Sequence, residues 1–166
     1  MRDSQSMSQA EVQLFLTQYN SALANMILPD LNGLTKNPSE IIFNAAQAHK
    51  INPKYLLVKL QKEQSLITET NPSQKQLDGA TGYGITDGCG WDCEMYKNNQ
   101  GFGKQVDSAA GIIRWYYDNK NTADWIKKSG ISYLIDGQTI IPANDATAFL
   151  YTYTPHLHGN LNFWNL

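Results

Sequence analysis

The chain has 166 residues, of which 42% are hydrophobic and 17% are charged, and its formal net charge at pH 7 is -2. This length and composition predict a globular chain with a hydrophobic core and exclude a disordered one. The near-neutral charge argues against nucleic acid as a partner, and the absence of a long apolar run excludes a membrane span. The first residues lack the apolar segment of a signal peptide, and residues 1–7 are interpreted as a tag or linker.

Three helical stretches are predicted in the first part of the chain. A capping box that begins at Ser8, followed by apolar residues at helical spacing, predicts a helix near residues 9–24. Asn-Pro pairs open two further helices, one at residues 37–38 and one that extends over residues 53–68. The first helix is expected to pack on a core formed by the rest of the chain.

The second part of the chain begins with a long glycine-rich segment, residues 70–92, that shows no periodicity. A loop of this length in a compact domain is usually functional or disordered, and its aromatic residues favour a functional loop. A helical stripe follows near residues 104–119, and a short helix is expected to start at Asn121 or Thr122 and to end at Gly130. An Asp-Gly pair predicts a small β-hairpin near residues 131–142, and Asn144 caps a last helix near residues 145–153.

The helix near residues 53–68 carries a glutamate, Glu63, on its apolar face. That face is formed by three residues: Leu56, Leu60 and Ile67. The neighbouring lysines, Lys59 and Lys62, are expected to point elsewhere. Because burial against apolar side chains raises a carboxyl pKa, Glu63 is a candidate general acid. The alternative is a helix-end glutamate that extends to solvent or pairs with a lysine.

The two cysteines, Cys89 and Cys93, lie four residues apart in a glycine-rich loop. They could form a short disulfide, typical of an extracytoplasmic protein, or remain free thiols. A zinc site with His156 and His158 is disfavoured because the spacing matches no standard finger. A cysteine–histidine peptidase is disfavoured because neither thiol is predicted at a helix start.

Three segments together resemble the soluble lytic transglycosylase branch of the lysozyme-like superfamily. In "INPKYLLVKLQKEQS" the glutamate follows Pro53 by ten residues, which is the interval of that family's first motif. "GATGYGITD", residues 79–87, and "YTYTP", residues 151–155, resemble its second and third motifs in the same order. The chain departs from the family pattern at Gln64, which stands before the expected serine, and at Thr152, which stands in place of asparagine.

The resemblance implies a mainly α (α+β), lysozyme-like single domain over residues 8–166 with its small hairpin near 131–142. It also implies a secreted murein-degrading enzyme that cleaves the β-1,4 bond of peptidoglycan, with Glu63 as acid and then base and Tyr151 as the residue that orients it. The substrate-binding residues would be Gly82, Tyr83, Ile85, Asp87, Trp91 and Tyr153. No cofactor or metal is expected, the partners are peptidoglycan glycan strands, and the protein is expected to be an extracytoplasmic monomer.

Two other functions remain open at this point. A lysozyme-type hydrolase would need a second carboxylate, for which Asp87 and Asp92 are candidates, although aspartate beside glycine is also ordinary turn chemistry. A cell-wall glycan-binding module would keep a cleft without turnover. Tyr83 and Trp91 could stack on sugar rings or simply pack in the loop, and Tyr151 could equally be a core tyrosine.

Overall fold

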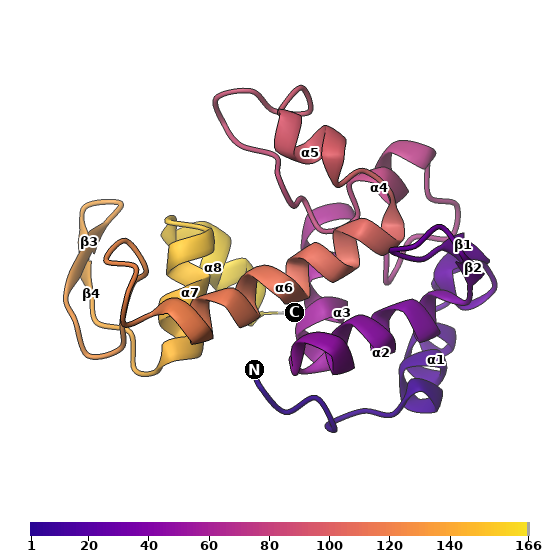
Figure 1. The fold of residues 1–166 in the computed structure, drawn as a ribbon, viewed down its shortest axis with the longest axis horizontal. Helices are drawn as coiled ribbons and strands as arrows, with labels where there is room; N and C mark the ends of the chain where they lie inside the picture. Colours follow the sequence, from indigo (N-terminus) through magenta and orange to yellow (C-terminus); the bar gives the residue numbers. More distant parts are fainter. Residues whose placement is uncertain (166) are drawn as a thin grey trace. The chain divides into compact units, whose positions relative to one another are not determined.

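The computed structural model describes residues 1–165 and confirms the expected mainly helical fold (Figure 1). It contains two small antiparallel hairpins, of which only the later one was expected. Its contacts divide the chain into two compact units, Met1–Gly111 and Ile112–Leu166. The expected single domain over residues 8–166 stays a prediction. Within the described residues, no helix is both long enough and apolar enough to cross a bilayer.

The first unit is built around three helices that pack in sequence, α1 against α2 and α2 against α3 (Figure 1). Its buried centre includes Val12, Leu16, Ile42, Ala46, Leu56, Leu60 and Val106. Its elements are α1 (Gln9–Gln18), the 3-10 helix η1 (Ala22–Ala24), β1 (Leu28–Pro29), β2 (Thr35–Lys36), α2 (Pro38–His49), α3 (Pro53–Gln64), α4 (Gln74–Asp78), α5 (Glu94–Asn98) and the first part of α6 (Phe102–Asn119).

The second unit surrounds Phe149, which is fully buried and contacts the rings of Tyr116 and Tyr117 at centroid distances of 5.7 and 4.7 Å. The hairpin predicted near residues 131–142 is confirmed, with Asp136 and Gly137 as its turn. Besides the end of α6, the elements are β3 (Tyr133–Ile135), β4 (Gln138–Ile140), α7 (Asp145–Tyr153) and α8 (Leu157–Trp164).

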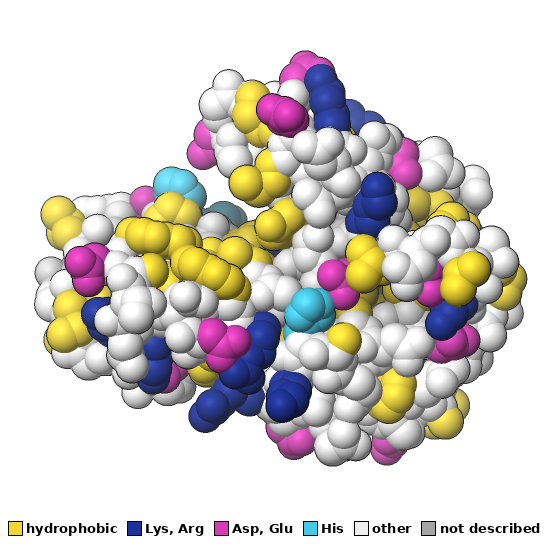
Figure 2. Space-filling model, in the orientation of Figure 1, with side chains coloured by type: hydrophobic (Ala, Val, Ile, Leu, Met, Phe, Trp, Pro, Cys, Tyr) yellow, Lys and Arg dark blue, Asp and Glu magenta, His cyan; other side chains and the backbone are white. Residues whose placement is uncertain are grey.

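Large apolar side chains reach solvent in both units, and Figure 2 shows them as patches between charged side chains. In the first unit, Ile27, Leu31 and Leu34 are 58%, 49% and 62% exposed on or beside the hairpin formed by β1 and β2. In the second unit, the indoles of Trp115 and Trp125 stack with a centroid distance of 5.5 Å. These exposed side chains are available for contacts outside the chain.

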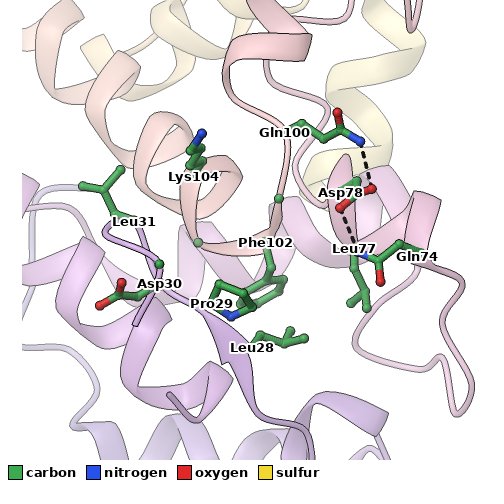
Figure 3. Close-up of a pocket in the computed structure, with 13 residues that line it drawn as sticks. Leu28, Pro29, Asp30, Leu31, Gln74, Leu77, Asp78, Gln100, Phe102 and Lys104 are labelled. Atoms are coloured by element: carbon green, nitrogen blue, oxygen red, sulfur yellow. Dashed lines mark hydrogen bonds between the residues drawn. The ribbon is translucent and has the colours of Figure 1, made fainter. Parts of the chain in front are cut away.

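The β1–β2 hairpin rests directly on the start of α6. A Cβ atom at Gly103 would lie 2.4 Å from the carbonyl carbon of Asp30, so only glycine allows this close approach. The hairpin, α4 and the start of α6 together enclose a pocket (Figure 3). Neither this hairpin nor the short helices α4 and α5 were expected from the sequence.

Residues 1–7, interpreted from the sequence as a tag or linker, make specific contacts in the first unit. Ser6 donates a hydrogen bond from its hydroxyl to the Asn52 side chain at 2.6 Å, and the side chain of Gln47 donates to the Ser4 carbonyl. Met7 is buried. The segment is therefore part of the fold of this unit.

Two predicted helix ends and one predicted helix are wrong, each for a local reason. The first helix ends at Gln18 because Asn20 has a φ of 53°, and the third ends at Gln64 because Ser65 has a φ of 57°. The helix expected to end at Gly130 is absent from this described segment. There the backbone N–H groups of Lys127 and Lys128 donate to the side chains of Thr152 and Tyr133 instead of to a helical carbonyl.

Candidate functional site

The candidate site begins at the last turn of α3, where Glu63 lies. The helix starts as the sequence predicts, because the Asn52 side chain accepts a hydrogen bond from the Lys54 N–H at 2.9 Å and Pro53 follows it. It ends where Ser65 adopts the left-handed conformation. Both ends of the helix are therefore fixed locally, and Glu63 has a defined position.

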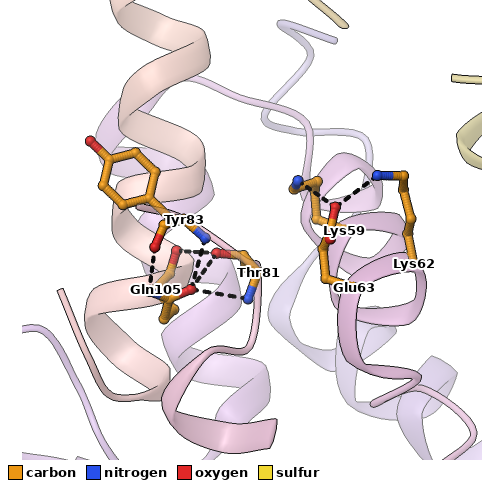
Figure 4. A network of polar contacts seen from close by, with 6 residues as sticks. All are labelled: Lys59, Lys62, Glu63, Thr81, Tyr83 and Gln105. Carbon is orange, nitrogen blue, oxygen red and sulfur yellow. Dashed lines mark hydrogen bonds and ion pairs between the residues drawn. The ribbon is translucent and has the colours of Figure 1, made fainter. Parts of the chain in front are cut away.

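Glu63 is held by two lysines of its own helix (Figure 4). Its Oε1 atom accepts from the Lys59 Nζ at 2.9 Å and from the Lys62 Nζ at 2.8 Å. The Lys59 side chain is only 3% exposed, whereas that of Glu63 is 24% exposed. The expectation that both lysines point elsewhere is wrong, and the alternative of a glutamate that pairs with lysine is confirmed.

The protonation of Glu63 follows from this arrangement. Burial raises the pKa of its carboxyl group, but the charges of Lys59 and Lys62 and their hydrogen bonds outweigh burial, and the pKa lies below the ordinary value of 4.5. Burial in turn lowers the pKa of Lys59, against the opposing effect of Glu63. The expected raised pKa of Glu63 is therefore wrong. As a consequence, Glu63 is ionised at neutral pH and does not carry the proton that a general acid must donate.

Gly82 covers the other oxygen of this carboxylate. Its φ of 68° lies in the left-handed region, and a Cβ atom there would be 3.2 Å from the Glu63 Oε2. Gly82, one of the predicted substrate-binding residues, therefore lies beside Glu63. The left-handed backbone favours glycine here, and a Cβ atom would force the Glu63 carboxylate to shift by a few tenths of an ångström.

Gln105 fixes the turn that contains Gly82, and the sequence interpretation missed it (Figure 4). Its Oε1 accepts from the backbone N–H groups of Thr81 and Tyr83 at 3.3 and 3.0 Å, and its Nε2 donates to the Tyr83 carbonyl at 3.1 Å. Gln105 is fully buried in α6. Its polar side chain within the apolar stripe near residues 104–119 was the available signal, since a buried amide requires partners.

The loop after this turn is closed by the Cys89–Cys93 disulfide, which confirms the bridged alternative for the two cysteines. Asp87 is exposed, and Asp92 forms an exposed ion pair with Lys97 at 3.2 Å. Among the described residues, neither Asp87 nor Asp92 shares a hydrogen-bond or ion-pair partner with Glu63. Ile85 is half-buried in the same loop.

Trp91 is packed within the loop. Its ring meets Tyr96 edge-on at a centroid distance of 5.1 Å, and the Lys75 ammonium group lies 4.5 Å from the ring centroid. These contacts favour the packing role over sugar stacking, since Trp91 already has partners on its ring. The substrate-binding roles of Trp91, Tyr83, Ile85 and Asp87 stay predictions.

Tyr151 and Tyr153 belong to the second unit, where both are half-buried in α7. The role of Tyr151 as a partner of Glu63 stays a prediction. His156 contacts Asp136 at 3.2 Å. Among residues 1–165, no group of three or more histidine, cysteine, aspartate or glutamate side chains is arranged to hold a metal ion.

Comparison with protein families identifies the chain. A family model described as "LasA, N-terminal domain" matches residues 3–134, which is most of the sequence, so the chain belongs to the LasA N-terminal domain family. The comparison with curated proteins and the comparison with solved structures each gave no match.

This family assignment corrects the resemblance drawn from the three short motifs. The chain is not a member of the lysozyme-like superfamily, and a lytic transglycosylase, a muramidase or another murein-degrading glycosidase is not supported. The reason lies in the motifs themselves: a capped helix with a late glutamate, a glycine-rich turn and a tyrosine-containing helix end are common local structures. The ion-paired Glu63 is consistent with the correction.

Proposed function

We propose that this chain is a non-catalytic binding domain of a secreted LasA-type protease precursor, and that its first unit binds the peptidase part of that precursor. The observation that carries this proposal is the family match over residues 3–134, which includes almost all of the first unit. The LasA N-terminal domain is associated with a protease precursor, which makes the peptidase part of that precursor the natural partner to test.

The chemistry of the first unit supports a binding role. The Glu63 carboxylate is ionised and already paired with Lys59 and Lys62, so it is occupied by its own helix. The Cys89–Cys93 bridge supports secretion, because disulfides persist in oxidising compartments.

The surface of the first unit supports a polypeptide as the partner. Ile27, Leu31 and Leu34 expose apolar side chains on or beside the β1–β2 hairpin. Protein interfaces typically have an apolar centre with a polar rim, and this hairpin offers such a centre beside Lys36 and Asp30. Leu34 is the most exposed of the three apolar residues and is the natural position to test.

The test is calorimetric titration of the full chain with the separately purified peptidase domain of a LasA-type precursor. We expect saturable binding by the unchanged chain. Leu34→Lys should bind at least about tenfold more weakly, because a charge replaces an apolar contact; a tenfold loss of affinity corresponds to about 1.4 kcal/mol of binding free energy. The matched control is Leu161→Lys in α8, where an equally large exposed leucine lies outside residues 3–134. It should bind as the unchanged chain does.

Two outcomes would contradict the proposal. One is the absence of binding to the peptidase domain at the highest soluble concentrations. The other is the release of soluble glycan fragments when the chain is incubated with purified cell walls, which would show catalysis. A titration with soluble peptidoglycan fragments tests the glycan partner predicted from the sequence, and sedimentation of the free chain tests the predicted monomer.

A further inference from the structure

The pocket beside the β1–β2 hairpin combines an apolar lining with two aspartates, Asp30 and Asp78 (Figure 3). Asp30 lies 3.6 Å from the Lys36 Nζ, so Asp78 is the carboxylate that matters here. Its volume is about 220 Å³, and every residue that lines it belongs to the first unit. Leu28, Leu77 and Phe102 supply apolar surface, and Asp78 lies at the end of α4 where that helix borders the pocket. Phe102 and Leu77 are almost fully buried, so their positions are fixed by the core.

Asp78 is held in place by neutral groups. Its Oδ1 accepts from the Gln74 Nε2 at 2.8 Å and its Oδ2 accepts from the Gln100 Nε2 at 2.9 Å. Within residues 1–165, no lysine, arginine or histidine forms an ion pair with it. Lys104 lines the same pocket, but its Nζ donates to the Asn98 carbonyl at 3.5 Å. Each Asp78 oxygen therefore keeps a lone pair for a donor from outside.

A second cavity of about 200 Å³ on the hairpin, which shares Asp30 with the first pocket, provides a contrast. Its two carboxylates already have cationic or ionisable partners: Asp30 lies 3.6 Å from the Lys36 Nζ, and Asp107 lies 2.8 Å from the His49 Nε2. Only the first of these two pockets presents a half-buried carboxylate without such a partner among the described residues.

We propose that the Asp78 pocket receives a basic side chain, lysine or arginine, from the polypeptide that the first unit binds. The methylene stem of such a side chain would contact Leu77 and Phe102, and its cationic head would donate to Asp78. Long basic side chains bury their stems against apolar surface in this way, and charge-assisted hydrogen bonds are stronger than neutral ones. The pocket volume corresponds to about seven water molecules, which is enough for such a side chain.

This inference rests on the proposed function, since it names the chemistry of the polypeptide that the first unit holds. It is tested with the full chain and three short blocked peptides that are alike except for a central lysine, arginine or norleucine. Norleucine has an apolar stem and no charge. Binding is followed through the backbone amide resonances of Leu77, Asp78 and Gly101 in a two-dimensional NMR titration.

We expect the lysine or arginine peptide to bind at least tenfold more tightly than the norleucine peptide, as measured by the dissociation constants obtained from the shifts of these resonances. Asp78→Asn should remove that preference, because it deletes the charge and keeps the shape. Glu94→Gln, an exposed carboxylate of the same unit in α5, should leave the preference unchanged.

Equal affinity for all three peptides would overturn the inference, because it would show an apolar pocket indifferent to charge. Shifts that avoid the pocket residues, or no shifts at all, would also overturn it. The proposed function is judged separately by calorimetry with the peptidase domain. If the unchanged chain binds that domain while the peptides show no charge preference, only the pocket assignment fails.

Discussion

Two carboxylates of the first unit, Glu63 and Asp78, have similar positions and opposite surroundings. Both lie near the C-terminal end of a helix, where the helix dipole disfavours negative charge and donors are needed. Glu63 obtains two ammonium groups, from Lys59 and Lys62, whereas Asp78 obtains two amides, from Gln74 and Gln100. The positive charges of the two lysines offset the negative charge of Glu63, whereas the neutral amides leave the negative charge of Asp78 uncompensated.

The difference separates a structural charge from one that is available to a ligand. Glu63 pairs with Lys59, which is buried, so we expect its charge to contribute to the stability of the first unit. The charge of Asp78, in contrast, forms no ion pair with a cationic side chain among the described residues. Substitutions that remove each charge and keep its shape therefore test the comparison directly.

The largest effect is expected for Glu63→Gln. Removing Glu63 takes away the opposite charge that offsets the cost of burying the Lys59 ammonium group, so the free energy of unfolding should fall by about 3 kcal/mol. This is the lower end of the usual range, because Glu63 is partly exposed. Urea unfolding monitored by circular dichroism and by the amide signals of α3 measures this change.

The control for this prediction is the double variant Lys59→Met with Glu63→Gln. Because both charges are then absent, it should recover at least half of the lost stability. A Glu63→Gln protein within about 0.5 kcal/mol of the unchanged chain would show that the ion pair does not stabilise the unit.

An intermediate effect is expected from acid. The pKa of Glu63 is below 4.5 in the folded chain, so between the folded and unfolded pKa values the unfolded chain binds more protons. The stability that the carboxylate contributes is therefore complete above the unfolded pKa and is lost as pH falls through the folded pKa.

The stability difference between the unchanged chain and Glu63→Gln should accordingly shrink as pH falls from about 7 toward about 3. The same urea series at several pH values measures it. A difference that stays constant over this interval would mean that Glu63 does not titrate as an ion-paired group. One that grows toward acid pH would indicate a raised pKa, as expected for a general acid.

The ion pair of Glu63 could have been predicted from the sequence. Lys59 and Glu63 are four residues apart in a helix whose start was correctly identified, and residues at this spacing lie on the same face. The apolar stripe of Leu56 and Leu60 was identified correctly and is fully buried. The error was to count the lysine stems as solvent-facing, although such stems readily lie against apolar surface.

The Asp78 pocket could not have been predicted in the same way. It depends on the β1–β2 hairpin, α4 and the start of α6, which are far apart in the sequence and whose contact is set by close packing at Gly103. Strands of two residues carry no periodic signal. Capped helices and the Asp136-Gly137 hairpin were predictable because their signals are local.

The smallest effect is expected for Asp78→Asn. Asparagine keeps one acceptor oxygen, and the amide of Gln74 or Gln100 can rotate to accept from the new NH₂ group, so both hydrogen bonds can persist. No buried cation loses a partner, because none forms an ion pair with Asp78 within residues 1–165. The free energy of unfolding should change by less than about 0.5 kcal/mol, as for most substitutions without a buried defect.

The measurement is the same urea unfolding series, with Glu94→Gln as the control for an exposed carboxylate. A loss of about 2 kcal/mol or more would mean that the Asp78 charge is needed for folding, and the two carboxylates would then not differ in kind. A small change in stability, together with the loss of the preference for basic peptides, would assign the Asp78 charge to recognition and the Glu63 charge to stability.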